Sequence, residues 1–259
     1  MAQGLSTGWE PDVPVGDTIA RRFAFAYADR VTAMARARGG RVLHRDDALI
    51  ADLGSPFGYD NAVVLLRPPD PNGLATLLTE AADVFPPHRW WVLLSLWPTP
   101  DLRPLGLTLG GHPPLMLRPP GPLPAPPPDL EIREATGPDE VAEFSRVLAA
   151  GYPVPAGDVP VAEPGIVGSV VRLFLGSVAG RAVGVAGSAV HHGLVEVDWV
   201  AVLPEARGRG YGAALTAAAA AVAPDLPAVL LASDDGRPTY RRLGFIDLFR
   251  VTMWEHPPG

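Results

Sequence analysis

The segment 207–212 contains residues whose types and order are typical of an anion-binding turn. The residues are Arg207, Gly208, Arg209, Gly210, Tyr211 and Gly212. The glycines leave backbone N–H groups accessible. The alanine-rich segment that follows, 213–223, is typical of a helix and ends before Pro224. Because unpaired N–H groups and the dipole at a helix N-terminus both attract negative charge, the sequence predicts a phosphate-binding site here.

Two kinds of phosphate ligand are compatible with this turn. Gly208, Gly210 and Ala213 match the G-x-G-x-x-[G/A] pattern of dinucleotide-binding domains. Such a fold needs several further strand–helix units, whereas the residues after the turn provide about one. The strand before the turn also carries Glu196 and Asp198, while a central parallel strand that is buried on both faces is a continuous apolar run. We therefore favour a different phosphate ligand.

The same turn resembles the [Q/R]-x-x-G-x-[G/A] signature of the GCN5-related N-acetyltransferases (GNAT), in which it wraps the pyrophosphate of acetyl-coenzyme A (acetyl-CoA). Residues 200–205, VAVLPE, resemble the strand of that family that ends in V-x-P-E, and residues 240–245, YRRLGF, resemble its Y-x-x-x-G-F ending. The resemblance covers residues 130–254. It implies the acyl-CoA N-acyltransferase fold, an α/β (α+β) fold with a mixed, mostly antiparallel central sheet flanked by helices. It also implies acetyl-CoA as the co-substrate.

The resemblance assigns expected roles to individual residues. Glu196, eleven positions before Arg207, stands where well-known family members carry a catalytic glutamate. Asp198 lies on the same strand face and is the alternative base, although both carboxylates could instead lie on a solvated face. Tyr240 matches the family tyrosine beside the coenzyme sulfur, where a phenol can protonate the departing thiolate. The remaining expected coenzyme contacts are Val200, Ala201, Val202, Ser233 and the six residues of the glycine-rich turn.

The backbone near Val202 has a second expected role. If the central strand splays from its neighbour, as the resemblance implies, N–H groups at this point would face the thioester oxygen. The sequence itself does not indicate such a splay.

A proline-rich segment, 118–129, with the sequence RPPGPLPAPPPD, divides the chain into two parts. Proline fixes φ and removes N–H donors, so this segment is predicted to be a semi-rigid extended linker. A docking motif for a proline-binding partner domain is the alternative. We therefore expect an N-terminal domain at 1–118, a linker at 119–129 and a GNAT domain at 130–259.

The N-terminal part is predicted to be a degenerate copy of the same fold. Residues 103–107, RPLGL, echo residues 241–245, RRLGF, and each segment follows an apolar strand. Two unrelated α/β domains that share a short pattern by chance are the alternative. The predicted N-terminal elements are a helix at 18–38 capped by Asp17, strands at 48–53, 61–67 and 90–97, a helix at 74–85, and an irregular segment at 98–117.

We expect one coenzyme site per chain. The N-terminal part enters its corresponding helix through 68–73, PPDPNG, where three prolines remove N–H donors and Asp70 would repel a pyrophosphate. This part is instead expected to complete the acceptor cleft and to cover apolar surface of its partner. The isolated C-terminal part should therefore be poorly soluble.

The composition restricts the remaining possibilities. Of the 259 residues, 47% are hydrophobic and 19% are charged, and the net charge is −7, which disfavours a surface that follows nucleic-acid phosphates. The absence of cysteine excludes disulfides and thiolate metal sites, and no His, Asp or Glu cluster has metal-ligand spacing. We find neither a signal-peptide pattern nor an apolar run long enough to span a bilayer. These observations predict a cytoplasmic protein without a metal or a membrane partner.

The expected function is an acetyl-CoA-dependent N-acetyltransferase that moves the acetyl group directly to a primary amine. The acceptor would be a small molecule or a protein amine, and the protein a monomer or a homodimer. A non-catalytic acyl-CoA binder, or an interaction module that uses the same fold, is the alternative function.

Overall fold

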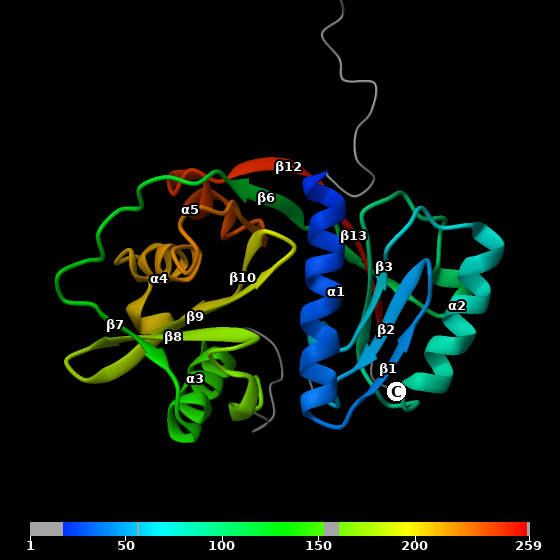
Figure 1. The fold of residues 1–259 in the computed structure, drawn as a ribbon, viewed down its shortest axis with the longest axis horizontal. Coiled ribbons are helices and arrows are strands. Elements are labelled where there is room, and N and C mark those ends of the chain that lie inside the picture. Colours follow the sequence, from blue (N-terminus) through cyan, green and yellow to red (C-terminus); the bar gives the residue numbers. More distant parts are fainter. Residues whose placement is uncertain (1–17, 56, 153–160, 258–259) are drawn as a thin grey trace, which may run out of the picture.

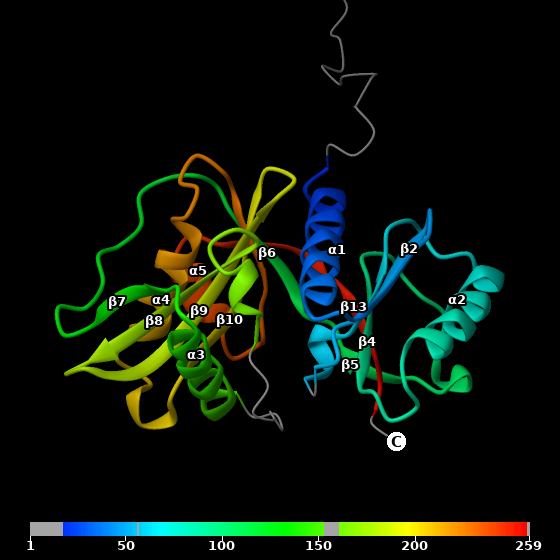
Figure 2. The same ribbon diagram turned by 60° about the horizontal axis from the view of Figure 1, so that its bottom comes forward.

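The computed structural model describes residues 18–55, 57–152 and 161–257, and within them the chain forms two β-sheets with helices beside them (Figure 1, Figure 2). In spatial order, the N-terminal sheet contains β1 (Arg41–His44), β2 (Ala48–Asp52), β3 (Ala62–Leu65), β4 (Trp91–Ser95), β13 (Thr252–His256) and β5 (Thr108–Gly111). The C-terminal sheet contains β12 (Ile246–Arg250), β6 (Pro114–Arg118), β11 (Ala228–Leu231), β10 (Leu194–Val202), β9 (Arg181–His191), β8 (Val171–Val178) and β7 (Glu131–Ala135).

The α-helices lie close to the positions that the sequence predicts. They are α1 (Ile19–Ala37), α2 (Pro71–Val84), α3 (Pro138–Gly151), α4 (Tyr211–Ala220) and α5 (Arg237–Arg242). The N-cap of α1 is Thr18, whose hydroxyl accepts the N–H of Arg21 at 3.3 Å. Asp17, the cap expected from the sequence, lies outside the described residues. Helix α4 ends three residues before the expected position, and the residues up to Pro224 form a turn.

The segment 98–117, expected to be irregular, was predicted wrongly. It contains the turn η2 (Arg103–Leu105) and the strands β5 and β6. Strand β6 starts at Pro114 and is flanked by further prolines, which weakens any local strand signal. Its pairing partners, β11 and β12, are far away in the sequence, so only the tertiary fold makes it a strand. The short strand β1 was also not predicted.

The two sheets exchange one strand each. Strand β13, from the C-terminal part of the chain, lies between β4 and β5 in the N-terminal sheet. Strand β6, from the N-terminal part, lies between β11 and β12 in the C-terminal sheet. Both crossing strands are visible in Figure 1, where β6 and β13 run between the two halves. Each half therefore completes the sheet of the other.

Apart from this exchange, the two sheets have the same order. The series β1-β2-β3-β4-β13-β5 corresponds to β8-β9-β10-β11-β6-β12. In each sheet one internal pair is parallel, β3 with β4 and β10 with β11, and a helix connects its strands. The two similar halves predicted from the sequence are confirmed. The boundaries at 118 and 130 stay a prediction, because neither range contains all strands of its own sheet.

The linker 119–129 contains neither a helix nor a strand. Arg118, at the end of β6, fixes its first residues. The guanidinium Nη atoms donate to the carbonyl oxygens of Pro119, Gly121 and Pro122, and Nε donates to that of Leu243 at 2.9 Å. One buried arginine thus ties the linker to the turn after α5.

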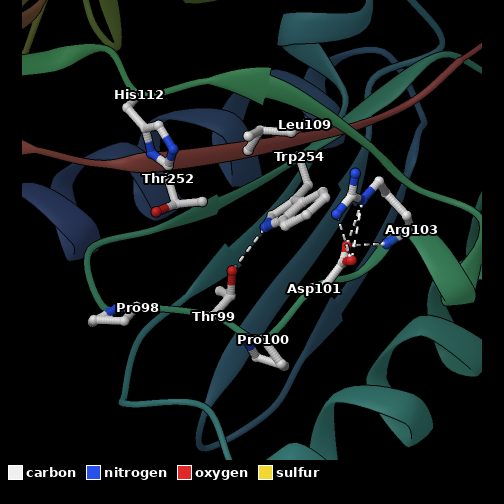
Figure 3. A pocket seen from close by; sticks show the side chains of 9 residues that line it. All are labelled: Pro98, Thr99, Pro100, Asp101, Arg103, Leu109, His112, Thr252 and Trp254. Carbon is white, nitrogen blue, oxygen red and sulfur yellow. Dashed lines mark hydrogen bonds and ion pairs between the residues drawn. The ribbon is translucent and has the colours of Figure 1, made fainter.

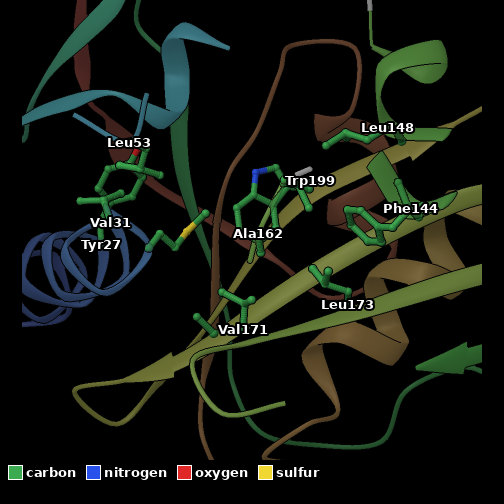
Figure 4. Packing of buried hydrophobic residues seen from close by; sticks show 14 of the residues in the cluster. Tyr27, Val31, Leu53, Phe144, Leu148, Ala162, Val171, Leu173 and Trp199 are labelled. Atoms are coloured by element: carbon green, nitrogen blue, oxygen red, sulfur yellow. The ribbon is translucent and has the colours of Figure 1, made fainter. Parts of the chain in front are cut away.

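Helix α1 lies between the two sheets (Figure 1). Its buried side chains belong to an apolar cluster that contains residues of both halves. Figure 4 shows that Tyr27 and Val31 of α1 belong to the same apolar cluster as Trp199 of β10 and Phe144 of α3. Full burial of each large apolar side chain contributes roughly 1.5–3 kcal/mol. Packing of this size holds the two halves together as one unit.

Candidate active site

The two central strands of the C-terminal sheet diverge where the predicted site residues lie. Strands β10 and β11 pair in parallel at two positions, the second of which joins Glu196 to Val229. Beyond this point β10 has a β-bulge after Asp198 opposite β9, and Trp199 has a φ of 52°, which is strained for a bulky side chain. A bulge bends its strand. The splay that the family resemblance implied is therefore present.

A cavity of about 230 Å³ lies at this divergence, between the two halves. From the C-terminal half it is lined by Tyr152, Glu196, Val197, Asp198, Trp199, Leu231, Ala232, Ser233 and Met253. From the N-terminal half it is lined by Phe23, Tyr27, Phe57, Tyr59, Asp60, Val92, Leu94 and Pro113. Three residues predicted from the sequence, Glu196, Asp198 and Ser233, therefore share one cavity, which both halves build.

Arg30 of α1 binds both carboxylates that were predicted as bases. Its Nε donates to Glu196 Oε2 at 3.0 Å, and its Nη2 donates to Glu196 Oε1 at 2.8 Å and to Asp198 Oδ2 at 2.9 Å. The side chains of Arg30 and Glu196 are 3% and 4% exposed, whereas that of Asp198 is 39% exposed. The guanidinium carbon lies 4.8 Å from the ring centre of Tyr27 and 5.0 Å from that of Trp199, within cation–π range.

Burial shifts the pKa values of several groups at the cavity. Burial raises the pKa of the Glu196 carboxyl, and the paired guanidinium of Arg30 opposes that rise. Burial also raises the pKa of Asp60 to about 6, although the hydroxyl of Ser55, which donates to Oδ2 at 2.7 Å, lowers it. The pKa of Tyr240 rises to about 12 through burial and the negative charge of Asp198. Asp60 therefore titrates close to neutral pH, and the Tyr240 phenol remains protonated there.

The glycine-rich turn has an open backbone at the start of α4. Gly208 and Gly210 have φ values of 77° and 82°, in the left-handed region that glycine adopts without strain. Gly210 is the N-cap of the helix and provides no side-chain hydrogen bond to the first amides. These N–H groups are therefore available to an anion at the positive end of the helix dipole.

Two side chains of the same turn have structural partners. Arg207 donates to the carbonyl oxygens of Val202 at 3.2 Å and Gly151 at 2.9 Å, which joins the end of β10 to the end of α3. The ring of Tyr211 is buried, and its hydroxyl donates to Asp129 at the end of the linker. Contact between the coenzyme and the backbone of Arg207 and Tyr211 stays a prediction. The side-chain donors of these two residues already bind other atoms of the protein. Arg209 and Gly212 lie in the same turn, with Arg209 exposed.

The end of β10 presents backbone N–H groups toward the open side of the strand. Leu203 donates its N–H to Val183 of β9 at 2.9 Å. Because N–H groups of successive residues point to opposite sides of an antiparallel strand, the N–H of Val202 points away from β9. The neighbouring residue Ala201 pairs with Val185 of β9, beyond the bulge that contains Val200. The predicted contacts at Val200, Ala201 and Val202 thus lie at the splayed end of the strand.

The two remaining predicted residues follow β11. The hydroxyl of Ser233 accepts the N–H of Gly236 at 3.0 Å, so it supports the turn into α5 while the residue lines the cavity. Tyr240 of α5 is half-buried and packs edge-on against Phe245, with ring centres 6.0 Å apart. Burial, and to a smaller extent the negative charge of Asp198, raises the pKa values of both Tyr152 and Tyr240.

Arg30 and Asp60 were not among the site residues predicted from the sequence. Arg30 lies between Tyr27 and Met34, in the buried face of α1. An arginine at an apolar position of an amphipathic helix is a signal of a buried anionic partner, and this signal could have indicated a site. Asp60 belongs to the short turn η1 (Gly58–Asp60) and has no comparable sequence signal.

A second cavity, of about 400 Å³, lies beside β13 and β5 of the N-terminal sheet (Figure 3). Four of its side chains form two pairs. The indole N–H of Trp254 donates to the hydroxyl of Thr99 at 2.8 Å, and Arg103 binds Asp101 at 2.7 Å. No residue predicted as catalytic lines it, so the cavity between the halves is the candidate active site.

The described ranges 18–55, 57–152 and 161–257 contain neither a candidate metal site nor a membrane-spanning helix. No group of three or more His, Cys, Asp or Glu residues there is arranged to hold a metal ion. No helix in these ranges is long and apolar enough to cross a membrane.

Comparison with known proteins agrees with this geometry. Residues 169–247 match the family model of the acetyltransferase (GNAT) domain, a range that includes β10, the glycine-rich turn and Tyr240. No curated protein matches the chain in sequence. The family model confirms the GNAT resemblance for this part of the chain and supports an acetyltransferase.

Solved structures resemble the chain over both halves. A GCN5-related N-acetyltransferase from Kribbella flavida is 23% identical with a TM-score of 0.72, and the match covers 94% of this chain and 97% of the other. A functionally unknown conserved protein from Staphylococcus epidermidis ATCC 12228 is 16% identical with a TM-score of 0.60, covering 84% and 94%. A GCN5-related N-acetyltransferase from Sphaerobacter thermophilus is 15% identical with a TM-score of 0.52, covering 92% and 94%. At these identities the likeness shows the fold.

Proposed function

Because residues 169–247 form a GNAT domain, we propose that this chain transfers an acetyl group from acetyl-CoA directly to a primary amine. The observation that carries the proposal is the cavity at the divergence of β10 and β11. The carboxylates of Asp60, Glu196 and Asp198 line this cavity beside β10, the strand that precedes the glycine-rich turn. The acceptor and the thioester would meet at this point.

We assign the pyrophosphate of the coenzyme to the backbone amides of the turn rather than to the guanidinium of Arg207. The positive φ values of Gly208 and Gly210 and the uncapped start of α4 support this assignment. Arg207 already binds two backbone carbonyls. In this proposal Arg207 holds the shape of the turn, and the exposed side chain of Arg209 would approach the phosphates.

In the proposed reaction the amine nitrogen attacks the thioester carbonyl carbon, a C–N bond forms, and the C–S bond breaks with its electron pair on sulfur. The N–H of Val202 would polarise the carbonyl oxygen, because it points to the splayed side of β10. The phenol of Tyr240 would give its proton to the thiolate, and the second proton that the nitrogen loses as the amide forms would return to the phenolate through water. The proton that leaves the ammonium group before attack would pass to a carboxylate of the cavity, directly or through water.

Of the two carboxylates predicted as the base, Asp198 is better supported than Glu196. Each oxygen of both carboxylates accepts a hydrogen bond: those of Glu196 from Arg30, and those of Asp198 from Arg30 and the backbone N–H of Trp199. The two residues differ in exposure, and the side chain of Glu196 is only 4% exposed. The side chain of Asp198 lines the same cavity and is 39% exposed. Glu196 would then act through Arg30, by holding the guanidinium that orients Asp198.

The function can be tested by calorimetry combined with a thiol-release assay. Titration with acetyl-CoA should give one site per chain, and free coenzyme A thiol should appear only when a primary amine is added. Binding without release for a broad set of amines would favour a non-catalytic acyl-CoA binder. Absence of binding would overturn the proposal.

Tyr240→Phe should separate the chemical step from binding. Removal of a general acid typically costs about 100-fold or more in rate, so kcat should fall by roughly that factor. The Kd of acetyl-CoA should remain unchanged, because the hydroxyl acts only as charge develops on sulfur. An equal loss in coenzyme affinity would show that Tyr240 holds the coenzyme instead.

A further inference from the structure

The walls of the candidate active site are aromatic on both sides. Phe57 and Tyr59 of the N-terminal half have ring centres 5.3 Å apart, and Phe57 lies 6.0 Å from Tyr152 of the C-terminal half. Tyr27 and Trp199 face the cavity from α1 and β10. The bound part of a ligand would therefore lie against flat apolar surfaces, which interact well with hydrocarbon chains and rings.

The charges at this cavity have one sign. Asp60, Glu196 and Asp198 line it, and none of the described residues that line it is a lysine, arginine or histidine. Two arginines outside the lining act on these groups. Arg30 already donates to Glu196 and Asp198, and the charge of Arg38 opposes the rise in the pKa of Asp60. Oδ2 of Asp60 accepts a hydrogen bond from the hydroxyl of Ser55. No described residue donates a hydrogen bond to Oδ1 of Asp60. A cationic group is therefore favoured in the cavity and an anionic group is disfavoured.

The cavity is also small. Its volume of about 230 Å³ lies below the range of roughly 300–1,000 Å³ that is usual for drug-sized ligands. It is bounded by α1, by the ends of β10 and β11 and by the turn η1. This space suits one small molecule rather than a folded protein surface.

We propose that the acceptor is a small hydrophobic monoamine without a carboxylate, such as an alkylamine or arylalkylamine, whose ammonium group binds between Asp60 and Asp198. This inference rests on the proposed function and specifies its substrate class. The aromatic walls take the hydrocarbon body, and the carboxylates take the charged end. An amino acid is disfavoured because its carboxylate would lie close to those of Asp60, Glu196 and Asp198.

The experiment compares matched amines in the thiol-release assay with the full chain. The probes are 2-phenylethylamine, L-phenylalanine, 1,4-diaminobutane and a short peptide with one free lysine. We expect kcat/KM for 2-phenylethylamine to exceed that for L-phenylalanine by about 100-fold or more, since like charges in a desolvated site are strongly unfavourable. Diaminobutane should also be poor, because its second ammonium would meet the apolar wall.

The outcomes separate this proposal from the proposed function. If L-phenylalanine or the lysine peptide is acetylated as well as 2-phenylethylamine, the acetyltransferase stands and the substrate class is wrong. If no amine is acetylated but 2-phenylethylamine binds in calorimetry with coenzyme A present and L-phenylalanine does not, the binding preference stands and the transfer reaction is wrong. If 2-phenylethylamine neither reacts nor binds, the present inference is overturned.

A variant at the N-terminal side of the cavity provides a second test. Asp60→Asn should raise KM for 2-phenylethylamine at least about tenfold and leave the Kd of acetyl-CoA unchanged. Asp46→Asn, at an exposed aspartate of the same half, should change neither value and is the matched control. An unchanged KM in Asp60→Asn would remove Asp60 from the ammonium site and contradict the proposal.

Discussion

Helices α2 and α4 start at corresponding places in the two halves, but their first turns differ. Each helix follows the first strand of a parallel pair, β3 in one half and β10 in the other. At α2 the carboxylate of Asp70 accepts the N–H of Gly73 at 3.1 Å. At α4 the N-cap is Gly210, which has no side chain to fill the position. A negative charge closes this site in one half, and the other half leaves it open to an anion.

The comparison shows that the position in the fold does not by itself make a coenzyme site. A helix N-terminus attracts anions only where its amides remain unoccupied. In the N-terminal half the side chain of Asp70 caps the N–H of Gly73, and Pro71 in the first turn has no N–H. We therefore propose that the N-terminal half serves the reaction differently, through Arg30 and Asp60, which reach the active-site cavity of its partner. The following predictions test this division.

The largest expected effect comes from Arg30→Met, which removes the cation that the N-terminal half provides. It would leave the Glu196 carboxylate buried and unpaired, which typically costs about 3–5 kcal/mol of unfolding free energy. Urea unfolding of the full chain measures this loss. The double variant Arg30→Met/Glu196→Gln should recover a large part of it, because the buried charge is gone. A loss below about 1 kcal/mol in the single variant would mean that the ion pair is not an essential link between the halves.

Gly210→Asp should make the start of α4 resemble that of α2. A carboxylate here faces the incoming pyrophosphate, and repulsion of several kcal/mol corresponds to a loss of about 100-fold or more in acetyl-CoA affinity. The backbone φ of 82° adds strain. Gly106→Asp is the matched control, since Gly106 has a φ of 85° and open space around it but lies in the N-terminal half. Calorimetry that shows undiminished affinity in Gly210→Asp would disprove the assigned coenzyme site.

Asp60→Asn should change how stability depends on pH. Burial raises the pKa of Asp60 from 3.8 to about 6, so the folded state prefers the protonated carboxyl. Stability is then highest below the unfolded pKa and falls as pH rises through about 6. Since one pKa unit corresponds to ~1.4 kcal/mol, the variant should be more stable than the parent by up to about 3 kcal/mol at pH 7 and by little at pH 4. Thermal unfolding across this range, with Asp46→Asn as control, should show the difference narrowing toward acid; a constant difference would contradict the buried-carboxylate interpretation.

The smallest effect is expected for Asp70→Ala, which removes the charge that closes α2. Loss of an N-cap costs about 1 kcal/mol, and Asp70→Asn, which preserves the cap, should cost less. Neither variant should bind a second coenzyme, because the prolines of the segment still lack N–H donors. A stoichiometry near two acetyl-CoA molecules per chain would show that the charge of Asp70 alone separates the two halves.

Local sequence signals predicted a large part of this molecule. The glycine-rich turn, the strand that carries Glu196 and Asp198, and helix α1 all depend on neighbouring residues, so their patterns are readable in short windows. The echo between residues 103–107 and 241–245 also marked corresponding places, since η2 precedes β5 as α5 precedes β12. The internal likeness of the halves followed from that echo.

The sequence could not indicate what depends on distant partners. Strands β6 and β13 are held by sheets in the opposite half, and no local pattern states which sheet a strand joins. The ion pair of Arg30 with Glu196 joins residues 166 positions apart. The family resemblance placed Glu196 before Asp198 as the base, and only the fold distinguishes the enclosed Glu196 from the accessible Asp198.

Because of the strand exchange, the N-terminal sheet cannot be completed until β13 has been synthesised. The place between β4 and β5 is filled by β13, which is translated about 140 residues after β5. At roughly 5–20 residues per second, the ribosome needs on the order of 10 s for that interval. During this time β4 and β5 present unpaired backbone edges, which are liable to pair with neighbouring nascent chains. The N-terminal sheet is therefore complete only when the C-terminal end of the chain has been synthesised.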